Sequence, residues 1–141
     1  RRTYRMQSKK ELDQGVPGRD ATVVDVRKGR IVKRDGKTST LLIEPARVGP
    51  KTLGLGVARY GKGASGTLHS HENFEQVIYV QSGRGVFVVD GDEVLVGPGF
   101  AVFIPPGARH QISNSGDEDL QFIFVCFPLV KGLGLEYPPE L

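Results

Sequence analysis

Residues 63–83 read GASGTLHSHENFEQVIYVQSG and residues 99–114 read GFAVFIPPGARHQISN, and these two stretches decide the fold. They contain all three histidines of the chain, which are His69, His71 and His110. His69 and His71 are two residues apart in a segment that alternates like a strand, so both side chains should point to one face. Neutral imidazole is a favoured ligand of divalent transition metals. The pattern therefore predicts a metal site built on histidine.

Both stretches resemble the signature motifs of the cupin superfamily. The first reads Gly63, five residues, His69-x-His71, four residues, Gln76, six residues, Gly83. The second reads Gly99, five residues, Pro105-x-Gly107, two residues, His110, three residues, Asn114. Every fixed position fits except one, where cupins most often have glutamate and this chain has Gln76. The resemblance implies an all-β, single-domain, cupin-type jelly-roll β-barrel. It also implies one divalent transition metal (Mn, Fe, Zn or Ni), with the ligands His69, His71, Gln76 and His110 pointing into the bore.

Glu75 is an alternative to Gln76 as the fourth ligand, because a frame with three intervening residues would select it. Neighbouring strand residues point to opposite faces, so both cannot reach the metal without a bulge. The spacing to Gly83 favours Gln76, whereas both faces of Glu75–Val80 are apolar and do not decide. With Gln76, every protein ligand is neutral and the ion keeps its double charge, which favours an anionic small-molecule substrate.

Short β-rich runs separated by nineteen glycines and nine prolines make up most of the chain. The Asp35-Gly36 and Asp90-Gly91 pairs predict tight antiparallel hairpins, because type I′ turns need positive φ at both central residues. Many short strands with frequent turn signals are typical of an all-β sandwich or barrel. The expected strands are Thr22–Val26, Arg30–Lys33, Thr38–Ile43, Thr52–Tyr60, Thr67–Ser70, Glu75–Val80, Gly85–Asp90, Glu93–Val96, Phe100–Ile104, Arg109–Ser113 and Leu120–Phe127.

The segment from Gly61 to Gly66 satisfies the G-x-G-x-x-G string found in dinucleotide-binding proteins. Such a site needs the last glycine to open a helix whose amino end faces the pyrophosphate. The residues that follow alternate like a strand and include two histidines. We therefore interpret these glycines as an entry into the next strand.

The 141 residues suffice for one domain, with an expected N-terminal arm (1–20), a barrel domain (21–130) and a C-terminal tail (131–141). No apolar run approaches the roughly 20 residues that span a bilayer, so no membrane partner is expected. A net charge of +3 without a base-reading element argues against nucleic acid. The single cysteine, Cys126, excludes an intrachain disulfide and favours the cytoplasm.

Three further residues are candidates for catalysis. Arg59 and Tyr60 end the strand before the first motif and point to opposite faces, so one of them could orient a carboxylate or donate a proton in the bore. Glu75, if it is not a ligand, is a candidate base. The expected pocket walls are Ile78, Val80, Ile112 and alternate residues of Phe122–Phe127.

The leading functional hypothesis is a Lewis-acid isomerase, decarboxylase or lyase that acts on a small oxygenated carboxylic acid or sugar acid. The ligand set is similar to that of cupins that open unsaturated uronate rings, although residues 122–127 lack the acidic residue of those enzymes. It also resembles that of small oxalate-decarboxylase-like proteins. Alternatives are an iron-dependent dioxygenase and a non-catalytic metal- and ligand-binding module. A homodimer is expected, with Val77 and Tyr79 on an apolar outer face.

Overall fold

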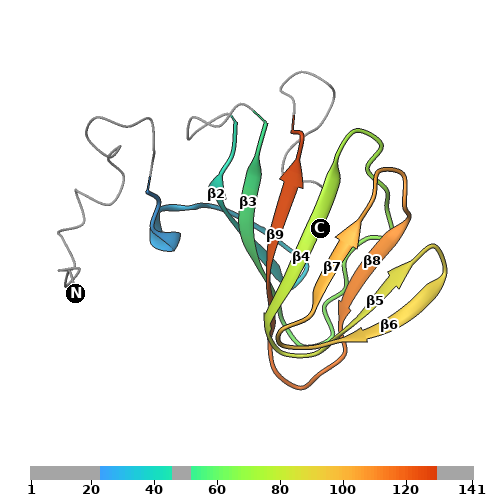
Figure 1. Cartoon of the computed structure of the whole chain (residues 1–141). Helices are drawn as coiled ribbons and strands as arrows, with labels where there is room; N and C mark the ends of the chain where they lie inside the picture. The colour runs from blue at the N-terminus through green and yellow to red at the C-terminus, as the bar shows by residue number, and fades with distance from the viewer. Residues whose placement is uncertain (1–22, 46–51, 130–141) are drawn as a thin grey trace, which may run out of the picture.

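The computed structural model of the protein describes residues 23–45 and 52–129, which form two antiparallel sheets (Figure 1). The larger sheet has six strands in the order β1-β2-β3-β9-β4-β7, and the smaller has three in the order β6-β5-β8. The predicted N-terminal arm (1–20) and C-terminal tail (131–141) lie outside the described residues. The strands are β1 (Arg30–Arg34), β2 (Lys37–Ile43), β3 (Gly54–Tyr60), β4 (Glu75–Ser82), β5 (Gly85–Val89), β6 (Asp92–Val96), β7 (Ala101–Ile104), β8 (His110–Asn114) and β9 (Leu120–Phe127).

Both predicted Asp-Gly hairpins are present. Asp35 and Gly36 have φ angles of 48° and 75° and join β1 to β2, while Asp90 and Gly91 have φ angles of 47° and 89° and join β5 to β6. Positive φ at both central residues matches the right-handed twist of the flanking strands. These two turns therefore fix the register of the hairpins, with Arg34 opposite Lys37 and Val89 opposite Asp92.

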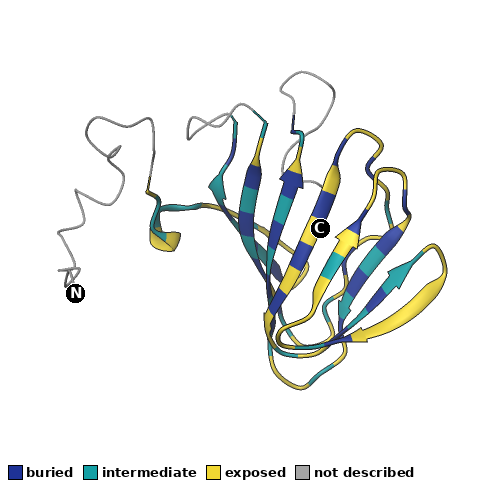
Figure 2. Ribbon diagram, in the orientation of Figure 1, coloured by how far each residue is buried: buried dark blue, intermediate teal, exposed yellow. Residues whose placement is uncertain are grey.

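The core lies between the inner faces of the two sheets. β9 is central in the larger sheet and pairs with β3 on one side and β4 on the other. Figure 2 shows buried and exposed residues alternating along β4, as expected for a strand with one face in the core. Phe122 and Phe124 of β9 are almost fully buried, and each contributes about 1.5–3 kcal/mol through the hydrophobic effect. The predicted all-β architecture of antiparallel sheets is confirmed.

Two predicted strands are wrong. Of the predicted strand Thr22–Val26, Thr22 lies outside the described residues, residues 23–25 have no regular structure, and Val26 begins a short 3-10 helix, Val26–Lys28. The Asp25 side chain caps this helix by accepting a hydrogen bond from the Arg27 backbone nitrogen. Thr67–Ser70 is not a regular strand either. Its backbone meets β8 only at one isolated bridge, between His69 and His110.

The glycine-rich string at residues 61–66 forms a turn and opens no helix, so the dinucleotide interpretation fails on structural grounds as well. The segment is tied to the smaller sheet, because the Gly66 nitrogen donates to the Ile112 oxygen at 2.9 Å. Within residues 23–45 and 52–129, no helix is long and apolar enough to cross a membrane.

Candidate metal centre

The three histidines come together because the loop between β3 and β4 is hydrogen-bonded to the second motif. The backbones of His69 and His110 exchange two hydrogen bonds, of 3.1 and 2.8 Å. The Gly107 nitrogen donates to the His71 oxygen at 2.7 Å. Although Thr67–Ser70 is not a strand, these backbone hydrogen bonds keep His69 and His71 on the side facing β8, as their spacing predicts.

Backbone carbonyls determine which nitrogen of two of these imidazoles is available. The Nδ1 atom of His69 donates to the Thr67 oxygen at 2.5 Å, and Nδ1 of His110 donates to the Ala108 oxygen at 2.9 Å. A carbonyl can only accept, so the proton of each neutral ring must sit on Nδ1. Nε2 of both residues therefore keeps its lone pair for a metal, in the arrangement that orients metal-binding histidines in general.

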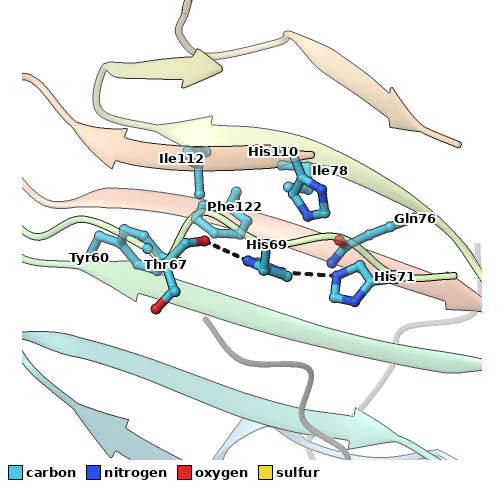
Figure 3. A pocket seen from close by; sticks show the side chains of 10 residues that line it. Tyr60, Thr67, His69, His71, Gln76, Ile78, His110, Ile112 and Phe122 are labelled. Carbon is cyan, nitrogen blue, oxygen red and sulfur yellow. Dashed lines mark hydrogen bonds between the residues drawn. The ribbon is translucent and has the colours of Figure 1, made fainter. Parts of the chain in front are cut away.

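The ligand atoms of the three imidazoles converge. They all lie within 4.8 Å of one another, and the Nε2 atoms of His69 and His71 are 3.0 Å apart (Figure 3). Two nitrogens held about 2.1 Å from one ion at a right angle would be separated by about 3.0 Å. The donor set and its spacing thus fit a divalent transition metal, and the cluster can hold one.

Gln76, not Glu75, faces this cluster. Gln76 is 5% exposed and lies on the inner face of β4, whereas Glu75 is on the exposed face. Figure 3 shows the Gln76 side-chain amide pointing toward His71. The frame with six residues between Gln76 and Gly83 therefore agrees with the geometry. With Glu75 as the ligand, its side chain would have to lie on the opposite face of β4 from the one it occupies.

Burial favours the neutral form of the imidazoles. It lowers the pKa of His71 to about 3, and the neighbouring rings of His69 and His110 add to this shift, while a hydrogen bond with Gln76 opposes it. Burial also lowers the pKa of His110. Metal binding requires unprotonated histidine, so these side chains are ready to coordinate a metal at neutral pH.

A small pocket extends from the histidines. Its space not filled by atoms is about 330 Å³, counting the part open to solvent. Burial raises the pKa of Tyr60, so its hydroxyl stays protonated at neutral pH. Among the described residues that line the pocket there is no carboxylate. They are Tyr60, Gly66, Thr67, His69, His71, Gln76, Ile78, His110, Ile112 and Phe122.

The structure brings only one of the three catalytic candidates to this pocket. Tyr60 lines it, but Arg59 points to the outer face, where its Nε donates to Asp119 at 2.6 Å. Glu75 also faces outward. Arg59 and Glu75 are therefore not placed to contact a ligand in the pocket, because neighbouring strand residues alternate between faces. Of the expected walls, Ile78, Ile112 and Phe122 line the pocket, while Val80 is fully buried in the core.

One residue of the site was missed from the sequence. Phe74 is 2% exposed and stacks on His71, with ring centroids 4.3 Å apart. A large apolar residue in a short loop between two metal-binding positions is a signal that could have revealed it, because such a side chain must bury itself locally.

Comparison with known proteins agrees with this fold. The family model for the cupin domain matches residues 56–126. The tetracenomycin polyketide synthase protein TcmJ of Streptomyces glaucescens is 32% identical over 96 residues, which cover 68% of this chain and 64% of that protein. An oxalate-binding protein of Thermotoga maritima is 38% identical over 67 residues, or 48% of this chain and 55% of that protein. The crystal structure of a predicted oxalate decarboxylase from Thermotoga maritima superposes with a TM-score of 0.69 and 25% identity, covering 77% of this chain and all of that one.

Proposed function

Because this chain belongs to the cupin domain family, we propose that it binds one divalent transition metal and acts on a small oxygenated organic acid in the adjoining pocket. The ligands are His69, His71, His110 and Gln76. The observation that carries the proposal is the 3.0 Å hydrogen-bond distance between the His69 and His71 Nε2 atoms, because a divalent cation that displaces the proton between them can bind both nitrogens at that spacing. The ligand set is neutral, so the site retains a positive charge that attracts an acid.

The bound ion would supply Lewis-acid chemistry by polarising a carbonyl or carboxylate oxygen. The chain would supply the rest. Ile78, Ile112 and Phe122 line the pocket with apolar surface, which excludes water and strengthens electrostatic contacts. The protonated Tyr60 hydroxyl would donate a hydrogen bond to the acid or move a proton to it. A donor beside a polarised oxygen would stabilise the charge that develops in isomerisation, decarboxylation or lyase chemistry.

The names of the relatives support an acid as the ligand. One similar protein is called oxalate-binding, and one similar structure is described as a predicted oxalate decarboxylase. This chain is similar in sequence to the first and shares the fold of the second, and its pocket wall offers no carboxylate in the described residues that would repel an anion. We therefore propose small carboxylic acids as the substrate class.

A second candidate function is binding without turnover. The observation that favours it is the scarcity of groups for proton transfer. Among the described residues that line the pocket, only Tyr60 and the ligand histidines have ionisable side chains. A module of this kind would hold the acid on the metal and release it unchanged. An iron-dependent dioxygenase is the third outcome to be tested, since three histidines leave coordination positions for substrate and dioxygen.

Elemental analysis of protein purified without added metal tests the metal site. We expect about one transition-metal ion per chain in the wild type, and less than about a tenth of that in His69→Ala and His110→Ala. The control is Asn73→Ala, an exposed residue of the same loop, which should keep the metal. Metal content that is the same in the histidine variants and the wild type would contradict the proposal.

Turnover assays on the metal-loaded protein separate the three functions. Small carboxylic and sugar acids that raise the melting temperature would be incubated with it and followed by NMR, with and without oxygen. Product formed anaerobically supports the isomerase, decarboxylase or lyase. Oxygen consumption coupled to substrate loss supports the dioxygenase. Stabilisation without conversion supports the binding module.

We also propose that the chain forms a homodimer through the outer face of the larger sheet. Val77, Tyr79, Phe103 and Phe127 of β4, β7 and β9 are 40–57% exposed there. Val77 lies opposite Phe103, so the exposed apolar side chains are neighbours. Apolar patches of this kind mark interfaces. Sedimentation should show a dimer at micromolar concentration and a monomer for Val77→Asp. A monomeric wild type would overturn this part of the proposal.

A further inference from the structure

Lys37 is buried at a position that the metal centre does not use. It is the first residue of β2 and lies opposite Tyr60 of β3 in the register. The alternation along β2 places Lys37, Ser39 and Leu41 on the inner face, and Lys37 is only 6% exposed. A lysine directly after a hairpin turn would ordinarily extend into water.

The Lys37 ammonium has no carboxylate partner among the ion pairs of the described residues. Its Nζ donates to the Ser65 oxygen at 2.7 Å and lies 5.9 Å from the centroid of the Tyr60 ring. An ammonium has three donors, and one carbonyl satisfies only one of them. Burying a charge in this way is unfavourable unless an anion compensates it, so the arrangement suits a ligand that brings negative charge.

A second polar group on the same face is also unsatisfied. Ser39 lies two residues beyond Lys37 on the inner face of β2 and is completely buried. Its hydroxyl has no hydrogen-bond partner in the described structure. Buried polar groups without partners are rare, and they often mark the place of a bound molecule or water. Lys37 and Ser39 thus leave two incompletely satisfied polar groups on the inner face of β2.

One of the two contacts of Lys37 belongs to the wall of the pocket. Tyr60, which the ammonium approaches, lines the pocket, and Gly66 beside Ser65 does so as well. Figure 3 shows Tyr60 and Thr67 at one end of the pocket, and His71 and Gln76 at the other. The pocket therefore has a metal-binding end and an end beside which Lys37 is buried.

The two ends are too far apart for a very short acid to bridge. Ser65 and His69 pair with Ser113 and His110, which are three residues apart along β8. At about 3.3 Å per residue, these two points are about 10 Å apart. The two carboxylates of oxalate are directly bonded, so oxalate would fill the metal end alone. A longer diacid reaches further toward Lys37.

We propose that Lys37 is the second anchor of a ligand that carries two carboxylates. One carboxylate binds at the metal end, and the other accepts a hydrogen bond from the Lys37 ammonium. This inference rests on the proposed function, and it narrows the substrate class from small organic acids to extended dicarboxylic acids.

Isothermal titration calorimetry on the zinc-loaded full chain tests the anchor with two matched probes. 2-Oxoglutarate and 2-oxopentanoate have the same α-keto acid head and the same number of carbons, but only 2-oxoglutarate has a second carboxylate. We expect the wild type to bind 2-oxoglutarate at least tenfold more tightly. In Lys37→Met the advantage should fall below twofold, while the affinity for 2-oxopentanoate stays unchanged. Lys33→Met, which removes an exposed charge from β1, should behave like the wild type.

The outcomes separate this inference from the proposed function. If both acids bind equally well and only in the presence of zinc, the proposed function stands and the anchor is overturned. An advantage of 2-oxoglutarate that survives in Lys37→Met also overturns the anchor. If neither acid binds although the wild type holds zinc, the anchor is overturned and the metal site stands; if the wild type holds no zinc, the proposed function fails as well. Should Lys37→Met not fold, Lys37→Gln keeps a donor for the Ser65 oxygen without the charge and tests the same difference.

Discussion

The Phe74 ring lies nearly flat against the His71 imidazole, with 24° between the ring planes and 4.3 Å between the centroids. Phe74 is on the loop that leads from His71 into β4, and it is almost fully buried. A flat neighbour restricts rotation of the imidazole about its bond to the Cβ atom. The stacking thus aims Nε2 of His71 at Nε2 of His69 before any ion arrives.

Replacing Phe74 should therefore loosen the metal site more than it loosens the fold. Phe74→Leu keeps an apolar side chain of similar bulk but removes the flat face, so we expect roughly a tenfold loss of metal affinity. The unfolding free energy should fall by only about 1–2 kcal/mol. Competition with a chromogenic chelator measures the first quantity, and urea denaturation of the metal-free protein measures the second.

Phe124→Leu is the matched control for this prediction. Phe124 is also a buried phenylalanine, but it lies opposite Gly56 of β3, and among the described residues no ring contact joins it to an imidazole. It should lose stability by a similar amount and keep its metal affinity. Equal loss of metal affinity in the two variants would show that Phe74 acts only as core.

Asn114 connects three segments of the barrel. Its amide nitrogen lies 3.0, 3.0 and 2.8 Å from the carbonyl oxygens of Tyr60, Gly61 and Glu118, and its Oδ1 accepts from the Gly116 nitrogen at 3.0 Å. In Asn114→Asp a carboxylate would face three carbonyl oxygens that have lost their donor. We expect the unfolding free energy to fall by about 2–4 kcal/mol in urea denaturation.

Asn73→Asp makes the same chemical change at an exposed position and should stay within about 0.5 kcal/mol of the wild type. If Asn114→Asp matched this control, the fixed asparagine of the second motif would have a role other than joining these segments.

Structural features that are determined by residues close together in the sequence could be predicted. β9 has the predicted bounds, because Leu120, Phe122, Phe124 and Cys126 alternate with less buried residues and the strand is paired on both sides. The Asp35-Gly36 turn was equally predictable, since its φ angles follow from the two residues alone. The shared face of His69 and His71 followed from their spacing, whereas their convergence with His110 was implied by the resemblance to the cupin motifs.

Features that depend on distant partners were not predictable. Thr67–Ser70 alternates like a strand, yet only His69 meets a partner on β8, and nothing in the local pattern reports that. Lys37 follows a turn and resembles a solvated residue until Ser65, 28 positions later, is seen to cover it. At Val26 a local signal was overlooked, because Asp25 before it is a good helix cap.

The buried imidazoles should make the metal-free protein sensitive to mild acid. Burial lowers the pKa of folded His71 from 6.5 to about 3, so between these values the unfolded chain binds a proton that the folded chain does not. The free energy of unfolding is therefore unaffected by this group above pH 6.5 and decreases progressively as the pH falls below 6.5, because protonation favours the unfolded chain. At pH 5 the loss is on the order of 2 kcal/mol.

Thermal melts of chelator-treated protein between pH 7 and pH 5 measure this effect. We expect the melting temperature to fall across this range in the wild type. It should fall less steeply in His71→Phe, because phenylalanine has no ring nitrogen to protonate. A melting temperature that stays flat in the wild type would contradict the buried neutral state of His71.

The neutral amide of Gln76 determines how the metal charge is shared between protein and ligand. In Gln76→Glu the fourth ligand carries a negative charge, so we expect metal affinity to rise about tenfold while the affinity of the loaded protein for 2-oxopentanoate falls by a similar factor. Glu75→Gln changes a neighbouring carboxylate on the exposed face and should alter neither quantity. Chelator competition and calorimetry measure the two affinities.

The opposite pattern, in which Glu75→Gln weakens metal binding and Gln76→Glu leaves both affinities unchanged, would mean that β4 presents its other face to the ion. A site with Glu75 as ligand would hold a less positive ion and would lose the preference for acids that the neutral set creates.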